Sequence, residues 1–182
     1  SSVVGNGDGP TSPYGLQKLI SEMECKLYSE LYGLDTICLR YFNAYSEDQQ
    51  YGCSYSTAIC AWMEMIRKNK PLRFDGDGEQ TRDLIHVEDI VNANIFLMKE
   101  KIKQPENFLN GKVFEVGSGE SVSMNYIKNF IDNNHAVKWN HAPTRPGDVR
   151  HTLADITELK KYGWEPKISI KEGLTRCFKK VI

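Results

Sequence analysis

Tyr14 and Lys18 could perform acid–base chemistry, because a spacing of four residues places both side chains on one face of a helix. An ammonium group close to a phenol favours the phenolate form, and such a tyrosine can take or give a proton near neutral pH. The spacing alone is weak evidence, since a chain with 9 tyrosines is expected to contain such a pair by chance. The rest of the sequence must decide whether the pair is catalytic.

The composition narrows the class of protein. With 182 residues and 40% hydrophobic content, the chain can form one domain or two small lobes. Its 23 basic and 24 acidic side chains nearly cancel, so no overall basic field attracts nucleic acid. No apolar run reaches the roughly 18 residues of a membrane helix, and no signal peptide is recognisable. We therefore expect a globular protein that binds neither nucleic acid nor membranes.

The cysteines indicate reduced thiols. They are odd in number, scattered and without a CxxC motif, which fits a cytoplasmic protein better than a disulfide framework or a zinc site. We expect no metal site. The five are Cys25, Cys38, Cys53, Cys60 and Cys177.

The element that must position Tyr14 is a long helix. Ser12 followed by Pro13 is typical of a helix start, and apolar residues then recur at helical spacing until Gly33. Residues 35–41 follow as a strand of nearly continuous apolar character, which favours an α/β fold. Further along we expect a loop at 44–54, turns at 75–78 and 143–148, strands at 72–74, 83–87 and 113–117, and helices at 55–68, 88–99, 124–132, 156–162 and 170–180.

Five motifs occur in a fixed order: YGLQK at 14–18, LRYFNAY at 39–45, GDGEQTRDLIHVEDI at 76–90, VFEVGSGE at 113–120 and RPGDVRHTLAD at 145–155. Together they resemble the extended short-chain dehydrogenase/reductases, specifically the NAD-dependent epimerases and dehydratases of nucleotide sugars. Within that branch the chain is most similar to the UDP-hexose (UDP-glucose or UDP-N-acetylglucosamine) 4-epimerases. The resemblance covers essentially the whole chain.

The resemblance implies an α/β fold that combines the C-terminal part of a Rossmann-like doubly wound parallel sheet with a smaller mixed α/β substrate-binding domain. Residues 1–44 would be a remnant of the NAD-binding domain, to which 84–117 return. Residues 45–83 and 118–182 would form the substrate-binding domain.

The resemblance also implies a reaction. Such enzymes bind NAD tightly, oxidise the sugar at C4, let the ketone rotate and return the hydride to the opposite face. Tyr14 would remove the C4 hydroxyl proton, Lys18 would contact the nicotinamide ribose, and Tyr41 would line the nicotinamide site. The third catalytic position, a serine or threonine on the preceding strand, falls on Ser2, with Ser1 as the alternative.

Four further positions match the family's nucleotide site. Asn43, Arg82 and Arg145 would bind the diphosphate, for which a planar guanidinium is well suited. Phe74 would lie beside the uracil. An alternative for both arginines is a structural ion pair or a turn.

Two residues of the last motif concern the substrate. Asp148 is the acidic residue of the family's RxGD pattern and is expected among the substrate-binding residues. Thr152, four residues later, would face the C2 substituent of the sugar. Because threonine is small, we hypothesise that UDP-N-acetylhexosamines fit as well as UDP-glucose or UDP-galactose.

Three polar residues of the third motif have a structural interpretation. Asp83 is expected to satisfy backbone groups, His86 to be a hydrogen-bonded core histidine, and Asp89 to favour a helix start through the helix dipole. We do not expect any of the three to be catalytic.

The chain also departs from the family. The glycine-rich dinucleotide fingerprint and the acidic residue for the adenosine ribose are absent from these 182 residues. Roughly the first third of a family member has no counterpart, so we interpret the chain as N-terminally truncated. We expect the polypeptide alone to be inactive, and the intact protein to be a homodimer that uses the tyrosine-bearing helix.

Alternative functions remain open at this point. A sugar-nucleotide 4,6-dehydratase or a UDP-glucuronate decarboxylase shares the Tyr/Lys chemistry and the oxidised C4 intermediate. A catalytically dead module that binds nucleotide sugars is the alternative outside enzymes.

Overall fold

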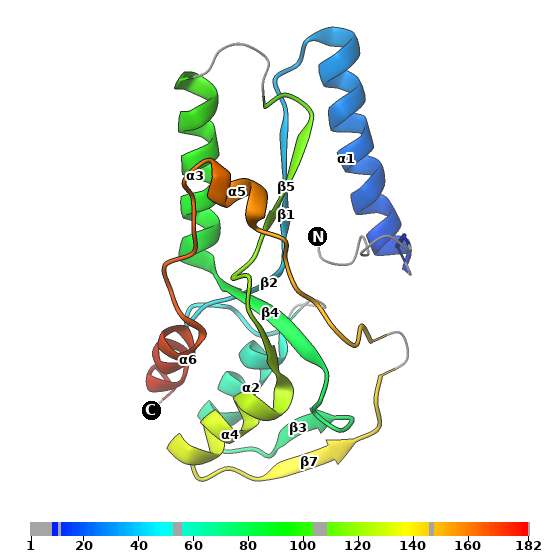
Figure 1. Ribbon diagram of the computed structural model, residues 1–182. Helices are drawn as coiled ribbons and strands as arrows, with labels where there is room; N and C mark the ends of the chain where they lie inside the picture. The colour runs from blue at the N-terminus through cyan, green and yellow to red at the C-terminus, as the bar shows by residue number, and fades with distance from the viewer. Residues whose placement is uncertain (1–8, 11, 53–55, 104–108, 146–147, 182) are drawn as a thin grey trace.

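The computed structural model describes residues 9–10, 12–52, 56–103, 109–145 and 148–181. Its helices and parallel strands form two lobes, an upper and a lower one in Figure 1. The α/β class is therefore as expected. Ser1, Ser2 and Cys53 lie outside the described residues.

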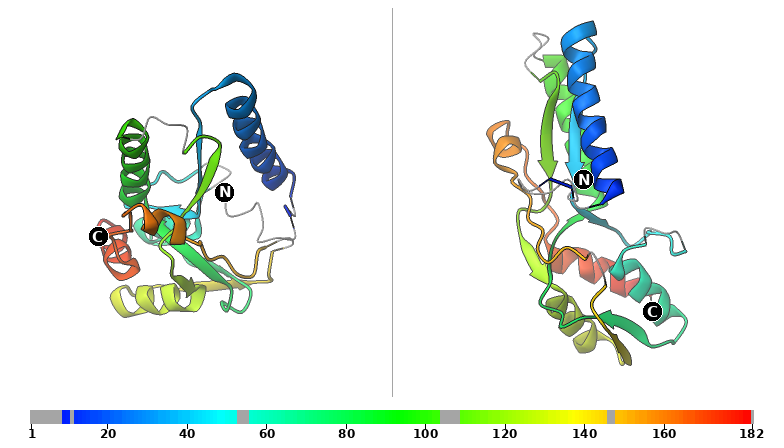
Figure 2. Two further views of the ribbon diagram at one scale, coloured as in Figure 1. Left: turned by 45° about the horizontal axis from the view of Figure 1, so that its top comes forward. Right: turned by 90° about the vertical axis from the view of Figure 1, so that its right-hand side faces the viewer.

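The upper lobe is built on two parallel strands, β1 (Ile37–Tyr41) and β5 (Lys112–Val116), paired in register from Ile37–Lys112 to Tyr41–Val116. Helices lie on both sides of this pair (Figures 1 and 2). They are α1 (Pro13–Tyr32), α3 (Val87–Lys103) and the short α5 (Thr157–Lys161).

Two further sheets lie below. At the junction of the lobes, the order is β2–β4–β6, with the first pair parallel and the second antiparallel. The lower lobe adds a parallel pair, β3 and β7, with three helices around it (Figure 1). The bounds are β2 (Asn43–Tyr45), β4 (Thr81–His86), β6 (Ser121–Ser123), β3 (Leu72–Asp75), β7 (Trp139–Ala142), α2 (Ala58–Arg67), α4 (Met124–Asn134) and α6 (Ile170–Lys179).

The ends of α1 follow from local chemistry. The hydroxyl oxygen of Ser12 accepts a hydrogen bond from the Gly15 N–H at 3.1 Å, which satisfies one of the open donors of the first turn. Gly33 adopts the left-handed conformation, with φ of 65°, and its N–H closes the last turn. Both boundaries agree with the sequence prediction.

Each lobe has its own core. The lower core joins α2, α4 and α6 to β3 through buried residues such as Trp62, Phe74 and Phe178. The upper core joins α3 to β5. It also includes Leu159 and Trp164, although both come late in the chain, after the strands of the lower lobe. The division into 1–44 with 84–117, and 45–83 with 118–182, stays a prediction.

The structure differs from the sequence prediction in several elements. Residues 43–45, which we expected partly as loop, form β2, and β7 was not expected at all. Helix α2 begins at Ala58, where Thr57 caps it, and not at residue 55. Helix α3 continues to Lys103 beyond the expected end at residue 99, and β4 begins at Thr81 and not at residue 83.

Asp83 ties three segments together where the lobes meet. Its side chain is fully buried, and one carboxylate oxygen accepts from the N–H and the hydroxyl of Ser118 at 2.7 and 2.8 Å. The other oxygen accepts from the N–H groups of Gly119 and Ala154, both at 3.0 Å. The carboxylate satisfies the backbone of the β5–β6 turn and of the segment after Thr152, as the sequence interpretation of Asp83 expected.

His86 and Asp89 are buried as well. His86 is 1% exposed, and its Nε2 lies 2.9 Å from a Glu47 carboxylate oxygen. Asp89 is also buried, but its carboxylate accepts from the N–H groups of Lys167 and Ile168 at 3.0 Å, so it anchors a distant segment to α3. Both side chains are thus engaged within the fold.

Within the described residues, no helix is long and apolar enough to cross a membrane. The same part of the chain has no group of three or more His, Cys, Asp or Glu side chains that could hold a metal ion.

We predict that Asp83→Asn destabilises the fold by about 2–4 kcal/mol. The asparagine NH₂ group would replace one carboxylate oxygen, and the two N–H or O–H groups that donate to that oxygen would lose their acceptor. Urea unfolding followed by circular dichroism measures this. The matched control is Asp48→Asn on the surface, which should change the free energy of unfolding by less than about 0.5 kcal/mol. Equal effects of the two variants would contradict the role of Asp83.

Candidate functional site

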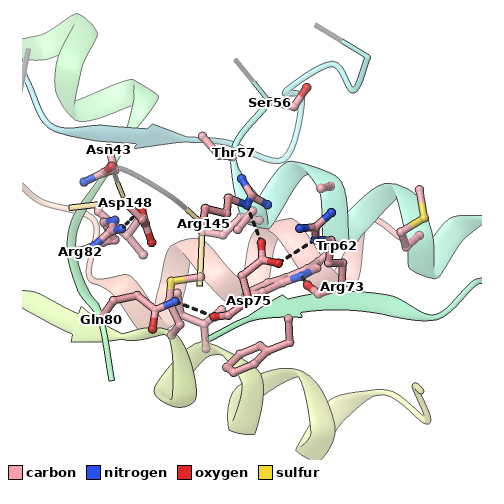
Figure 3. Close-up of a pocket in the computed structure, with 18 of the residues that line it drawn as sticks. Asn43, Ser56, Thr57, Trp62, Arg73, Asp75, Gln80, Arg82, Arg145 and Asp148 are labelled. Carbon is pink, nitrogen blue, oxygen red and sulfur yellow. Dashed lines mark hydrogen bonds and ion pairs between the residues drawn. The ribbon is translucent and has the colours of Figure 1, made fainter. Parts of the chain in front are cut away.

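A cavity of about 450 Å³ opens in the lower lobe. Figure 3 shows that its labelled polar side chains come from segments far apart in sequence, including β2, β3, β4 and the loop after β7. Five of the residues predicted from the sequence line it: Asn43, Phe74, Arg82, Arg145 and Asp148. Three separate motifs, at 39–45, 76–90 and 145–155, therefore meet in one place.

Arginine–aspartate pairs dominate the polar wall. Asp75 holds Arg73 through Nε at 2.7 Å and Arg145 through Nε at 2.6 Å (Figure 3). Asp148 holds Arg82 through Nη2 at 2.7 Å. Three guanidinium groups thus face one cavity, each with a carboxylate partner.

The net effect of these contacts on Asp75 is to favour its charged form. Burial alone would raise the pKa of this carboxyl, but hydrogen bonds from Arg73 and Arg145 outweigh it and leave the pKa below its ordinary value. Asp75 is therefore a carboxylate at neutral pH.

The apolar wall is aromatic. Phe74 stacks on Trp62 with an interplanar angle of 14°, and Trp139 meets both rings edge to face. The indole N–H of Trp62 donates to the Arg73 carbonyl at 2.7 Å, which fixes the ring against β3. Phe74 is only 3% exposed, so its ring belongs largely to the core. Its place beside a base stays a prediction.

Asn43, which lines the cavity and is half-buried, is hydrogen-bonded to the buried Thr152 behind it. The amide of Asn43 donates to the Asp83 carbonyl at 2.9 Å and to the Thr152 hydroxyl at 3.1 Å. The same hydroxyl accepts from the Asp83 N–H at 3.0 Å. A contact from the Asn43 amide to a phosphate would need one of these bonds to break, and Thr152, 7% exposed, is not among the lining residues. Their predicted roles toward substrate remain untested.

Tyr14 and Lys18 lie apart from this cavity, at the N-terminal end of α1. The Lys18 ammonium lies 5.3 Å from the centroid of the Tyr14 ring, so the two side chains share a helix face as predicted. Tyr14 is 41% exposed. Tyr41, at the end of β1, donates its hydroxyl to Asn94 on α3 at 3.0 Å.

Sequence reasoning missed Arg73 and Asp75. The alternation in β3 contained the signal, since Leu72 and Phe74 are buried while the two charged residues point the other way. The sequence pattern indicates only a turn at Asp75, because glycines and a further aspartate follow it.

Comparison with known proteins identifies the family. Residues 7–177 match the family model described as GDP-mannose 4,6 dehydratase. A UDP-glucuronate 4-epimerase from Thermodesulfobacterium geofontis is 33% identical over 173 residues, which cover 93% of this chain and 50% of that protein. The chain spans about half the length of the curated relatives it matches.

Two solved structures share the fold. The UDP-N-acetylglucosamine 4-epimerase from Methanobrevibacter ruminantium M1, in complex with UDP-N-acetylmuramic acid, has a TM-score of 0.84 and 32% identity, covering 98% of this chain and 59% of that one. The UDP-glucuronic acid 4-epimerase from Bacillus cereus, in complex with UDP-glucuronic acid and NAD, has a TM-score of 0.84 and 26% identity, covering 100% and 59%. The chain belongs to the GDP-mannose 4,6-dehydratase family of NAD-dependent epimerases and dehydratases.

Proposed function

We propose that the whole protein is an NAD-dependent UDP-sugar 4-epimerase, and that the cavity binds the nucleoside diphosphate of its substrate. The observation that carries this proposal is the convergence of Arg82 and Arg145 on one cavity beside an aromatic wall. Guanidinium groups bind phosphate oxygens through paired N–H donors, and an apolar wall suits a base and ribose. Relatives with UDP-sugar 4-epimerase names support the reaction.

The nicotinamide end of NAD fits the exposed groups at the N-terminal end of α1. Lys18 and Tyr14 supply an ammonium and a hydroxyl for the ribose. The family resemblance adds Tyr41 to the nicotinamide site, although its hydroxyl donates to Asn94 on the α3 side of β1. NAD would supply the hydride acceptor and donor. Tyr14 takes the proton of the sugar C4 hydroxyl and returns it after rotation, while Lys18 holds the tyrosine in orientation. The proposed third catalytic residue is Ser2.

The described residues offer no counterpart to a pyrophosphate-binding glycine turn, and the 182-residue sequence contains no G-x-G-x-x-G pattern. We therefore propose that the polypeptide alone binds UDP without retaining NAD. Without a hydride acceptor Tyr14 cannot complete the reaction, so this polypeptide is expected to be inactive.

The proposal includes substrate range. The family pattern places Thr152 toward the C2 substituent of the sugar, and threonine is a small residue at that position. We propose that UDP-N-acetylhexosamines are accepted alongside UDP-glucose and UDP-galactose, and the UDP-N-acetylglucosamine 4-epimerase among the relatives supports this.

The family description favours one alternative, a sugar-nucleotide 4,6-dehydratase. The products separate the two functions, because an epimer keeps the mass of the substrate and a dehydratase product has lost one water.

A homodimer through α1 is also part of the proposal. Its face away from β1 carries exposed apolar side chains at helical spacing: Leu16, Ile20, Met23, Leu27 and Leu31. We propose the cytoplasm as the compartment, on the basis of the cysteine pattern.

The central test is titration of the 182-residue polypeptide with UDP and with NAD by calorimetry, together with a product assay on the whole protein. We expect UDP binding without NAD binding by the polypeptide, and interconversion of UDP-glucose and UDP-galactose by the whole protein. A product lacking one water would favour the dehydratase, and failure to bind UDP would contradict the assignment of the cavity.

We predict that Arg145→Ala weakens UDP binding to the polypeptide about 10- to 100-fold, since one guanidinium contact to a phosphate is lost. Arg150→Ala is the matched control: Arg150 forms an equivalent pair with Asp77 at 2.9 Å but does not line the cavity. Calorimetry measures both affinities. Equal losses would show that net charge, and not a specific contact, governs binding.

We predict the opposite effect for Asp75→Asn, a tightening of UDP binding by about 10-fold, because the ionised carboxylate competes with the diphosphate for Arg145. Calorimetry on the variant and on the unchanged polypeptide measures the difference, which should disappear for uridine because uridine has no phosphate. Weaker UDP binding in the variant would mean that Asp75 instead positions Arg145 for the ligand.

A further inference from the structure

Two cysteines face each other between α1 and β1. Along β1, Ile37 and Leu39 pack against the upper core on the α3 side. Because side chains alternate between the faces of a strand, Thr36, Cys38 and Arg40 point the other way, toward α1. The only cysteine of α1 is Cys25.

Two contacts fix the register of the helix against the strand. The guanidinium of Arg40 binds the Glu22 carboxylate at 2.6 and 3.0 Å, and the Thr36 hydroxyl donates to the Cys25 carbonyl at 3.0 Å. Glu22 and Cys25 lie three residues apart and therefore share a helix face. Cys38 lies midway between Thr36 and Arg40 and therefore faces the turn of α1 that carries Glu22 and Cys25, close enough for the Cys25 thiol to raise the pKa of Cys38.

We propose that Cys25 and Cys38 form a thiol–disulfide site that reacts with a low-molecular-weight disulfide such as oxidised glutathione. This inference rests on the packing of α1 on β1 and does not depend on the proposed function. Both side chains are partly exposed, whereas Cys60 and Cys177 are buried.

The reaction balances as an exchange. The Cys25 thiolate attacks one sulfur of oxidised glutathione, the S–S bond breaks, and one glutathione leaves as thiolate. The Cys38 thiolate then attacks the Cys25 sulfur, and the second glutathione leaves. The protein loses two protons and two electrons, and one glutathione disulfide becomes two thiols.

The environment sets the order of attack. Burial, with the hydrogen bond and charge of Cys25 and the nearby Glu22, raises the pKa of the Cys38 thiol to about 12. Cys38 is therefore a poor first nucleophile. After Cys25 has formed a mixed disulfide it can no longer carry a negative charge, which removes one of the causes that hold Cys38 protonated.

The bond would close the turn between α1 and β1, and it would fix the helix that carries Tyr14 and Lys18 to the sheet. A crosslink across a short loop restricts the unfolded chain, so the oxidised form should melt at a higher temperature. We expect a rise of several degrees in Tm, reversed by dithiothreitol.

The test is oxidation of the 182-residue polypeptide in a glutathione buffer, trapping of free thiols with N-ethylmaleimide, and peptide mass spectrometry. Trypsin cleaves after Lys18, Lys26 and Arg40, so peptides 19–26 and 27–40 carry one cysteine each. We expect these two peptides to be joined by a disulfide. Alkylation of both cysteines under oxidising conditions, or pairing of either with another cysteine, would overturn the proposal.

Two variants test the order of attack. Cys38→Ser should accumulate glutathione on Cys25, because nothing displaces it. Cys25→Ser should leave Cys38 less modified than that, because burial, the largest cause of its raised pKa, remains. Glutathione on Cys38 in the second variant, at the level seen on Cys25 in the first, would refute the assignment of Cys25 as the first nucleophile. The mapping on the unchanged protein does not depend on how well either variant folds.

Discussion

The buried carboxylate of Asp83 is the interaction on which the arrangement of the site depends. A charge inside a protein is tolerated only when hydrogen bonds compensate for its lost hydration, and four donors do so here. Those donors belong to the β5–β6 turn and to the segment after Thr152, so one side chain specifies where both segments lie. Gly117 leaves room for this carboxylate, because a Cβ atom at that position would lie 2.6 Å from an Asp83 oxygen. Arg82 precedes Asp83 in β4, so its side chain points to the opposite face of the strand, where it lines the cavity.

The charged side chains of the polar cavity wall largely neutralise one another. Each arginine already has a carboxylate partner, which keeps the guanidinium groups oriented before a ligand arrives. A diphosphate would then enter by exchanging partners with groups already in place, so little side-chain order needs to be created on binding. The aromatic wall of Trp62 and Phe74 is rigid for a different reason, since the two rings stack on each other and Trp139 packs against both.

The sequence predicted the parts of the fold that depend on local signals. The Ser12 cap and Gly33 fixed α1, and the motif order pointed to residues that meet in the cavity. Elements that depend on distant pairing were missed: β2 exists because the chain leaves β1 at Phe42 and pairs next with β4. The Asp75 bridge was missed likewise, since Arg145 comes from a loop seventy residues away. No local pattern could show that the Asn43 amide is occupied by Asp83 and Thr152.

The chain crosses between the lobes several times within a small region: from β1 to β2 at Phe42, from β4 into α3 at His86, and from β5 to β6 around Ser118. Phe42, Ala154 and Ile156 form a small buried cluster of their own. A hinge needs a few residues whose dihedral angles can change freely, but these crossings are short, hydrogen-bonded and side by side. We therefore expect this junction to resist bending of one lobe toward the other, so the lobes should hold the cavity and the N-terminal end of α1 in a fixed relation.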